Sequence, residues 1–562
     1  MKNILVKSLI VLVGLTLATS CIEEVLPQGG SQNAEQVSKN ESAIAAILNS
    51  LPSSMMTSNA MGYAIHYEDH TDFGISSVYM RLEHMLEDIA TQSKQPGYNR
   101  FFAYDMCQAQ GSDYIYCAYF WDCYYAWIKT TNDVIRLIPE DTEDPIMKTM
   151  LGQAYAYRGM IYLDLARIFE AKEINPQYKM SEATKKVLGL TIPKITETST
   201  EDDAKFNPRM PREEAYDFIL SDLTKAESIL KGLKIDYTMP SESAVYMLKA
   251  RAYIEMAACQ DEGAAAKALE YAQKVIDISG KTPLTQLQWE DPANGFNNGK
   301  ANNAWIWGLT SSSENQLDII TFTSHMCTEN NWGYALLSQI GINKALYDKI
   351  PDHDFRKHSW IDPKMQDFYK YKLAGTPKNQ ADFWTGDGDQ RPPVLPYQSI
   401  KFRPAGGECE NSTSGNVTDF CLMRIEEAYY IKAEAQARLG RLSDAAKTLE
   451  EIVNTRYNQN VGRYSCTSQA MALPTFLEEM LTQKRIEFWG EGILFFDYKR
   501  LNHGITRAYP GSNHASMFAL NCEGRSPQWN VVITRAEFQS NTAITDDTNN
   551  PDPSEFTTPE TF

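Results

Sequence analysis

The sequence predicts a mainly α-helical protein in which about four helical hairpins support a large, irregular, loop-rich region with short strands. Two observations lead to this prediction. Apolar residues recur at spacings of three and four within residues 120–280 and again within 423–457, as they do on one face of an α-helix. Between these ranges, residues 281–420 lose that period, and Gly, Asn, Pro, Ser and Thr become common.

The stretch 423–457 is the clearest of the predicted hairpins. Gly440 stands where a residue in the left-handed conformation would end the first helix, and Ser443 is a suitable cap for the second. Ala433 and Ala445 let the two helices pack closely, and Tyr429 is expected to fill the space beside them. This pattern is typical of a tetratricopeptide hairpin. One such unit cannot bury its own apolar face, so further hairpins are expected.

The remaining elements follow from the same periodicity. Alanine-rich hairpins recur between unequal insertions, and residues 304–309 alternate as a short strand does. Helices are expected at 42–56, 78–91, 120–138, 147–169, 212–230, 241–257, 263–278, 335–350 and 474–500. The tryptophans assigned to the core are Trp121, Trp127, Trp305, Trp307 and Trp489.

Residues 1–20 have the features of a bacterial lipoprotein signal peptide. Lys2 and Lys7 precede an apolar run, and small residues precede Cys21, which would become the lipidated N-terminus. A plain secretory signal that happens to contain Cys21 is the alternative. Residues 21–40 are polar and are expected to form a flexible tether, and 41–562 are expected to form one domain. No later run approaches the roughly 18 apolar residues of a membrane span.

Charge and cysteine content narrow the possible partners. The formal net charge is −19, and no Lys/Arg cluster offers the basic face that binding to duplex nucleic acid requires. The nine cysteines after Cys21 include no CxxC pair, so most are expected to be buried and reduced. Cys409 and Cys421 flank a Gly/Asn/Ser/Thr loop and could form a disulfide.

Several separated motifs carry a family resemblance. They are the W-x-x-x-Y-x-x-I-x-x-x-N run of 121–132, the R-x-x-E-x-Y-x-x-x-A-E-A run of 424–435, the stretch 483–500 around Glu487 and Gly492, residues 530–537, and Asn549-Asn550-Pro551. In this order they resemble the SusD/RagB family of Bacteroidetes outer-membrane nutrient-binding lipoproteins. Lys484 stands where the family has Glu, and Leu494 stands near where it has Arg. These departures are expected to leave the helix intact and to loosen a local ion pair.

The resemblance implies a binding protein and not an enzyme. Such a protein sits on the outer face of the outer membrane, held by its lipid, as a lid on a TonB-dependent (SusC-like) transporter. It captures a glycan or, in some members, an oligopeptide, and needs no cofactor. The helical hairpins would face the transporter, and the irregular parts at 281–420 and 501–562 would carry the ligand site.

Sugar binding requires exposed aromatic faces and a few planar hydrogen-bonding groups. The resemblance places these on the loop before the 121–132 motif and on loops after the short strand. The aromatic candidates are Tyr98, Phe101, Tyr104, Trp289, Trp332 and Tyr334, and the hydrogen-bonding candidates are Arg81, Arg100, Asn330 and Asn331. Trp332 is the first choice, because its Asn and Gly neighbours offer little core. A loop tryptophan packed under its own turn is the alternative.

Other functions and ligands have weaker support in the sequence. Glu487 and Glu491 have a spacing compatible with paired carboxylates, but glycosidases draw their two carboxylates from opposite sides of a cleft, so a surface glycoside hydrolase is less favoured. Asp387 and Asp389 could ligate a structural calcium ion or could simply form a turn. The histidines show no zinc-binding spacing. A tetratricopeptide scaffold that binds only protein is a further alternative.

Overall fold

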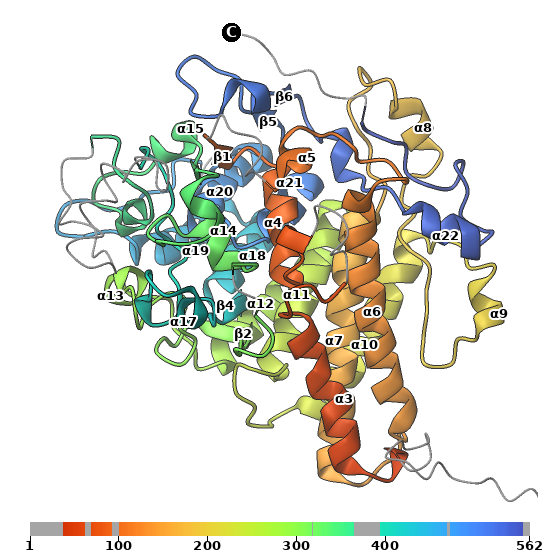
Figure 1. The fold of residues 1–562 in the computed structure, drawn as a ribbon. Coiled ribbons are helices and arrows are strands. Elements are labelled where there is room, and N and C mark those ends of the chain that lie inside the picture. The colour runs from red at the N-terminus through yellow and green to blue at the C-terminus, as the bar shows by residue number, and fades with distance from the viewer. Residues whose placement is uncertain are drawn as a thin grey trace, which may run out of the picture.

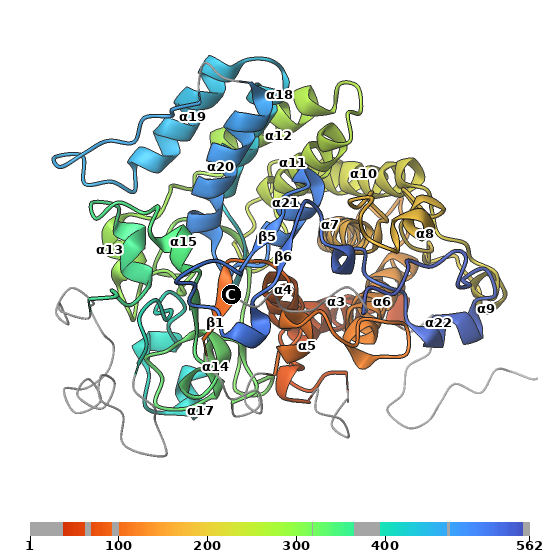
Figure 2. The same ribbon diagram turned by 90° about the horizontal axis from the view of Figure 1, so that it is seen from above.

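The computed structural model describes residues 37–61, 69–92, 100–316, 319–364, 394–468 and 472–554. Its long helices form a curved series in which each packs against the next, and Figure 2 shows this series running round one side of the molecule. In order they are α3 (Glu41–Ser54), α6 (Ile115–Leu137), α7 (Pro145–Phe169), α10 (Arg212–Leu230), α11 (Glu242–Ala258), α12 (Ala264–Ile278), α18 (Glu426–Arg438), α19 (Leu442–Asn454) and α20 (Leu473–Phe488). The predicted mainly helical fold is therefore confirmed.

The contact between α12 and α18 explains why the repeat is interrupted in the sequence. These helices pack together although all of residues 279–425 lie between them in the chain. The loop-rich region is thus an insertion into the helical series, and it carries the short helices α13 (Gln286–Glu290), α14 (Phe322–Met326), α15 (Lys344–Tyr347) and α17 (Ser412–Gly415) (Figure 1).

Three short antiparallel strand pairs join distant parts of the chain. β2 (Trp305–Leu309) pairs with β4 (Phe420–Arg424), β1 (Ile89–Thr91) with β3 (Ile340–Ile342), and β5 (Ile505–Thr506) with β6 (Asn521–Cys522). The strand predicted at 304–309 is confirmed. Because β4 leads directly into α18, the β2–β4 pair fixes the end of the insertion against the helical series.

The predicted hairpin at 423–457 forms as α18 and α19, with two corrections. Gly440 has a φ of 75° and open space around it, and Ala433 and Ala445 are fully buried between helices, as expected. Ser443 is not the cap, since α19 already begins at Leu442 after Arg441. Tyr430, not Tyr429, is the fully buried tyrosine of α18.

Three predicted helices are wrong in part because strand pairing and glycines override the periodicity. Residues 78–91 divide into α4 (Ile75–His84) and β1. Within 335–350 the chain forms β3, where a Cβ on Gly341 would lie 2.2 Å from the Tyr397 carbonyl oxygen. The helix expected at 474–500 breaks into α20 and α21 (Leu494–Leu501), because Gly490 and Gly492 between them have φ values of 73° and 82°.

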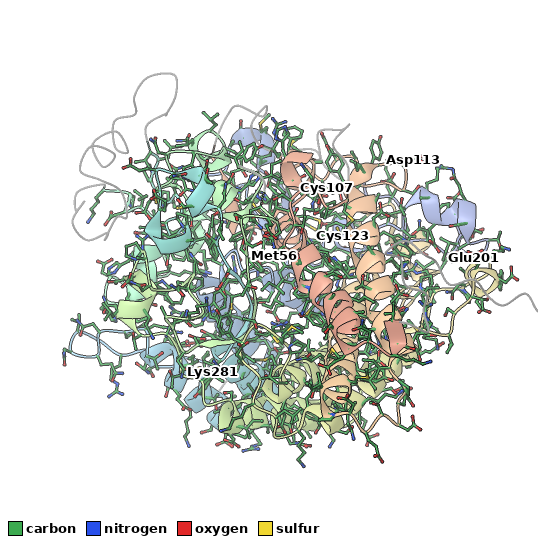
Figure 3. The ribbon with its side chains drawn as sticks, turned by 60° about the horizontal axis from the view of Figure 1, so that its bottom comes forward. Met56, Cys107, Asp113, Cys123, Glu201 and Lys281 are labelled. Carbon is green, nitrogen blue, oxygen red and sulfur yellow. The ribbon has the colours of Figure 1, made fainter. Side chains whose placement is uncertain are left out.

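The core is apolar around the helices and contains a charged network where α18, α20 and the insertion meet. All five tryptophans assigned to the core are buried. Figure 3 shows Met56 and Cys123 within the body and Glu201 at its outer edge, in agreement with their burial. Within the described residues, no helix has both the length and the apolar character needed to cross a bilayer.

Candidate functional site

A cavity of about 290 Å³ opens between residues 289–300 and residues 401–419 of the insertion. This volume falls near the lower end of the range for small-molecule sites, about 300–1,000 Å³, which suits a short part of a larger ligand. The side chains that line it include Trp289, Asp291, Asn297, Asn298, Thr418 and Asp419. We call it the Trp289 cavity.

Trp289 is held rigidly at the wall of this cavity by the short helix α13. Thr285 and Gln288 cap the helix reciprocally, each side chain bonding the backbone of the other residue. The indole N–H of Trp289 donates to the Ser359 hydroxyl at 2.8 Å, and its ring meets Phe296 edge-on at 5.1 Å between centroids. The sequence predicted an exposed aromatic side chain here. Trp289 is only 5% exposed, so it lines the cavity but is mostly buried.

Three cations line the cavity, and two of them, Lys401 and Arg403, are already bonded to protein groups, while the third, Lys300, is exposed. Lys401 donates to the carbonyl oxygens of Glu487 and Trp489 at 2.9 Å and to Glu491 at 2.7 Å, which uses all three of its donors. Burial lowers the pKa of Lys401 to about 8. Arg403 donates to Glu329 at 2.5 Å and to the Glu290 carbonyl at 3.1 Å. These two side chains therefore support the wall and offer little to an anionic ligand.

Backbone contacts orient the polar groups of the cavity. The Asn297 amide donates to the Arg403 carbonyl at 2.8 Å, and the Asp419 carboxylate accepts from the Ser311 backbone N–H at 3.0 Å. Burial raises the pKa of Asp419. The Thr418 hydroxyl accepts from the Ala405 N–H at 2.7 Å. An aromatic wall beside amide, hydroxyl and carboxylate groups held in place suits a neutral, hydroxyl-rich ligand such as a sugar.

Three other predicted aromatic residues, Tyr334, Phe101 and Tyr104, are buried elsewhere, in a group of rings that includes His325. His325 stacks on Tyr334 with centroids 4.3 Å apart and meets Phe101 edge-on at 5.2 Å, and burial lowers its pKa to about 3. Tyr104 is also fully buried against Phe101. The expectation that these aromatic side chains are exposed on loops is wrong, because all three are buried, and Tyr104 and Tyr334 lie in short helical turns, residues 102–105 and 334–336.

Arg81 is also a core residue and not an exposed hydrogen-bonding group. It is fully buried, donates to the Tyr104 hydroxyl at 2.5 Å and to the Thr71 hydroxyl at 2.8 Å, and lies 3.8 Å from the centre of the Tyr119 ring. Arg100, by contrast, is half-buried, and among the described residues its Nε has no hydrogen-bond partner.

Trp332 is 8% exposed, so the alternative of a tryptophan packed under a turn holds for this residue. A Cβ on Gly415 would lie 2.8 Å from the Trp332 ring and 3.3 Å from Pro404, so the absence of a side chain there makes room for the indole. Pro404 lines the Trp289 cavity, so Gly415 borders both the Trp332 ring and a residue of the cavity wall. Asn331 is exposed, while Asn330 is buried and donates to the Thr323 carbonyl at 3.1 Å.

Some predicted sites fall outside the described residues: Cys21, Tyr98, and the Asp387 and Asp389 considered for calcium. In the described part of the chain, three or more His, Cys, Asp or Glu side chains nowhere gather as a metal site would require.

Comparison with known proteins identifies the family. Residues 36–254 match a SusD-like family model described as starch-binding and associating with the outer membrane, and residues 291–557 match the SusD family model. The chain belongs to the SusD family. A SusD-like protein, P38, from Formosa agariphila is 22% identical over 403 residues, covering 68% of this chain and 72% of that relative.

Solved SusD structures share the fold. A SusD-like carbohydrate-binding protein from Bacteroides vulgatus superimposes with a TM-score of 0.68 at 19% identity, covering 90% of this chain and 98% of the other. A SusD superfamily protein from Bacteroides thetaiotaomicron gives a TM-score of 0.65 at 18% identity, with coverages of 91% and 100%. NanU from B. fragilis gives 0.61 at 14% identity, with coverages of 93% and 99%.

The SusD motif around Glu487 forms the charged network of the core. Glu487 accepts from Arg424 and Arg456 at 2.7 Å and from Arg356 at 3.2 Å, and these arginines hold its pKa well below the ordinary range. Glu491 is bound by Arg424 and Lys401. Both carboxylates are buried and paired, so this pair cannot supply the proton donor of a glycosidase.

Lys484, which stands where the SusD family has Glu, forms an ion pair in this chain. Its ammonium lies 2.7 Å from Asp497, which also accepts from Arg500. The expectation that Lys484 loosens a local ion pair is therefore wrong, because α21 brings Asp497 within its reach.

Proposed function

We propose that this SusD-family chain is a non-catalytic cell-surface lipoprotein that captures an oligosaccharide or polysaccharide and delivers it to a TonB-dependent, SusC-like transporter. The observation that carries the proposal is the Trp289 cavity, whose lining combines this tryptophan with polar groups that backbone contacts hold in place. The carbohydrate-binding description of one solved relative supports the same ligand class. The volume of the cavity fits a short part of a longer chain.

A binding screen tests the ligand class. The soluble chain from residue 22 is titrated calorimetrically against plant, host and microbial glycans and against a mixture of oligopeptides. We expect one glycan class to bind and no shortened product to appear during prolonged incubation. Binding of peptides alone, or release of shorter sugars, would contradict the proposal.

The exposed Asn331 provides a test of where the ligand binds. Asn331 lies on the segment that carries Trp332, and its backbone N–H bonds the Cys409 carbonyl, so the side chain can be replaced without breaking that contact. Asn331→Ala is expected to keep the wild-type affinity. A loss of more than about tenfold, equivalent to 1.4 kcal/mol, would move the site from the Trp289 cavity to this segment.

We further propose that Cys21 carries the lipid that anchors the chain to the outer membrane. The signal-like run of residues 1–20 and the family's association with the outer membrane support this. Radiolabelled palmitate should enter the wild-type protein and not the Cys21→Ser variant. Cell-surface protease should remove the wild-type protein from intact cells, and co-purification with the transporter should be lost in the variant. Equal labelling of both proteins would exclude this anchor.

A further inference from the structure

Two segments of the insertion run side by side behind the Trp289 cavity. The N–H of Thr328 donates to the Ser399 carbonyl at 3.1 Å, and the N–H of Asn331 donates to the Cys409 carbonyl at 2.7 Å. Between these contacts, Glu329 and Arg403 form an ion pair at 2.5 Å. Residues 327–331 and 399–409 are therefore held together at three successive points.

A pair of thiols lies at the junction of these segments. Cys327 is fully buried and Cys409 is 2% exposed, and the two lie on the segments that these contacts hold together. The neighbouring Cys327 thiol and burial raise the pKa of Cys409. Both are free thiols in this structure. Cys421, which the sequence offered as the partner of Cys409, lies in β4 opposite Gly308, so that alternative is not formed.

We propose that Cys327 and Cys409 form a disulfide when the chain folds in an oxidising compartment, and that this bond locks the wall of the Trp289 cavity. Cys409 follows the Pro404–Gly406 turn that lines the cavity, and Cys327 precedes the segment of Trp332, whose ring and Pro404 both border Gly415. Disulfides persist in proteins outside the cytosol, where this chain is expected to function. The bond would close a loop of about 80 residues. In the chain-entropy model, closing a loop of this length lowers the entropy of the unfolded chain substantially and so stabilises the fold.

The cross-link forms by thiol–disulfide exchange with a disulfide oxidant, such as an exported thiol oxidoreductase or oxidised glutathione. One cysteine thiolate attacks the oxidant and forms a mixed disulfide, and the second attacks that bond and releases the reduced oxidant as a thiol. The two thiol protons pass to the released thiolates and solvent, and two electrons pass to the oxidant. Because both thiols are buried, the exchange takes place before the two segments close.

Mass spectrometry tests whether the bond exists. The chain from residue 22 is exported to a bacterial periplasm, purified without reductant, unfolded, alkylated and digested. We expect a cross-linked peptide pair containing Cys327 and Cys409, and an intact mass about 2 Da below that of the reduced chain, since two hydrogen atoms are lost. Complete alkylation of both cysteines, even after incubation of the unfolding and refolding protein with oxidised glutathione, would overturn the proposal.

Reductant-dependent melting gives a second test that does not depend on comparing mutant stabilities. Reduction should lower the Tm of the wild-type protein by about 4 °C, from the loop-closure term and the unfolding entropy of a chain of this size. Cys327→Ser and Cys409→Ser should each abolish this reductant effect, and the control Cys421→Ser should retain it. A reductant effect that survives in the Cys409→Ser variant would contradict the assignment.

Discussion

Replacing Glu487 by glutamine tests whether the charged core holds the helical series to the insertion. The carboxylate bonds three buried guanidinium groups, from Arg356, Arg424 and Arg456. The surrounding network is balanced, with Lys401 as the fourth cation and Asp354, Glu426 and Glu491 as the other carboxylates. Glu487→Gln keeps the shape, removes one negative charge, and turns an N–H₂ group toward the guanidiniums.

The loss in free energy of unfolding expected for Glu487→Gln is the cost of leaving a buried charge unpaired, about 3–5 kcal/mol. With an unfolding entropy of about 2.1 cal/mol/K per residue, a chain of this length loses roughly 1 °C of Tm for each kcal/mol. We therefore expect Glu487→Gln to lower Tm by about 3–5 °C at neutral pH. The control is Glu182→Gln, which removes an exposed ion pair with Lys185 and should cost less than about 0.5 kcal/mol.

The stabilising effect of Glu487 should depend on pH in a defined direction. The folded-state pKa of Glu487 lies well below its ordinary value of 4.5, so its contribution to stability is present above about pH 4.5 and is lost as the pH falls further. The gap in Tm between wild type and Glu487→Gln should narrow in acid. Differential scanning calorimetry at neutral pH and at pH 4 measures both effects. A Glu487→Gln shift no larger than that of Glu182→Gln would refute the reasoning.

Two further substitutions follow from the structure. Burial raises the pKa of Glu83 to about 8, so the stability that it contributes is complete below about pH 4.5 and is lost as the pH rises through 8. The free energy of unfolding of Glu83→Gln, measured by thermal unfolding, should therefore rise relative to that of wild type by about 2 kcal/mol between pH 5 and pH 7. The same difference between the two proteins at both pH values would contradict this. Gly492 has a φ of 82°, and an added Cβ would lie 2.2 Å from the Cβ of Tyr79, whereas Gly440 has a similar φ and open space around it. Gly492→Ala should therefore lower the free energy of unfolding by about 1–3 kcal/mol more than Gly440→Ala does. Equal losses in denaturant titrations would show that the contact with Tyr79 relaxes freely.

The sequence predicts the helical series well because its apolar period is local. The hairpin of α18 and α19 follows from alanines and Gly440 that need no distant partner. The period fails at β1 and β3, since those residues are fixed by pairing with each other across about 250 residues of the chain. Local pattern carries no information about such pairing.

The candidate site was harder to predict because exposure is a tertiary property. Trp332 has polar neighbours in sequence, yet Gly415 makes room for its ring. Trp289 is the predicted residue that lines the cavity, while Asn297, Asn298 and Asp419 were missed. The signal available for them was the Asp-Pro-Ala-Asn-Gly-Phe-Asn-Asn-Gly run at 291–299, whose turn-forming residues bring several amides close together.

The burial of Glu426, Glu427 and Glu434 in α18 was also missed, since charged residues on a helix ordinarily face solvent. Partners from other parts of the chain reach them: Arg456 after α19, Arg251 in α11, and Arg500 in α21. These ion pairs explain why a helix with many charges sits at the centre of the fold.

Filling the Trp289 cavity is the most direct test of the central claim. Ala293 lines the cavity, whereas the next residue, Asn294, is exposed and does not. Ala293→Trp and the matched control Asn294→Trp are titrated calorimetrically with the glycan that the screen identifies. We predict that Ala293→Trp lowers the affinity at least tenfold, a loss of about 1.4 kcal/mol, at an unchanged Tm, while Asn294→Trp binds as the wild-type protein does. Equal affinities for all three proteins would show that the glycan binds elsewhere.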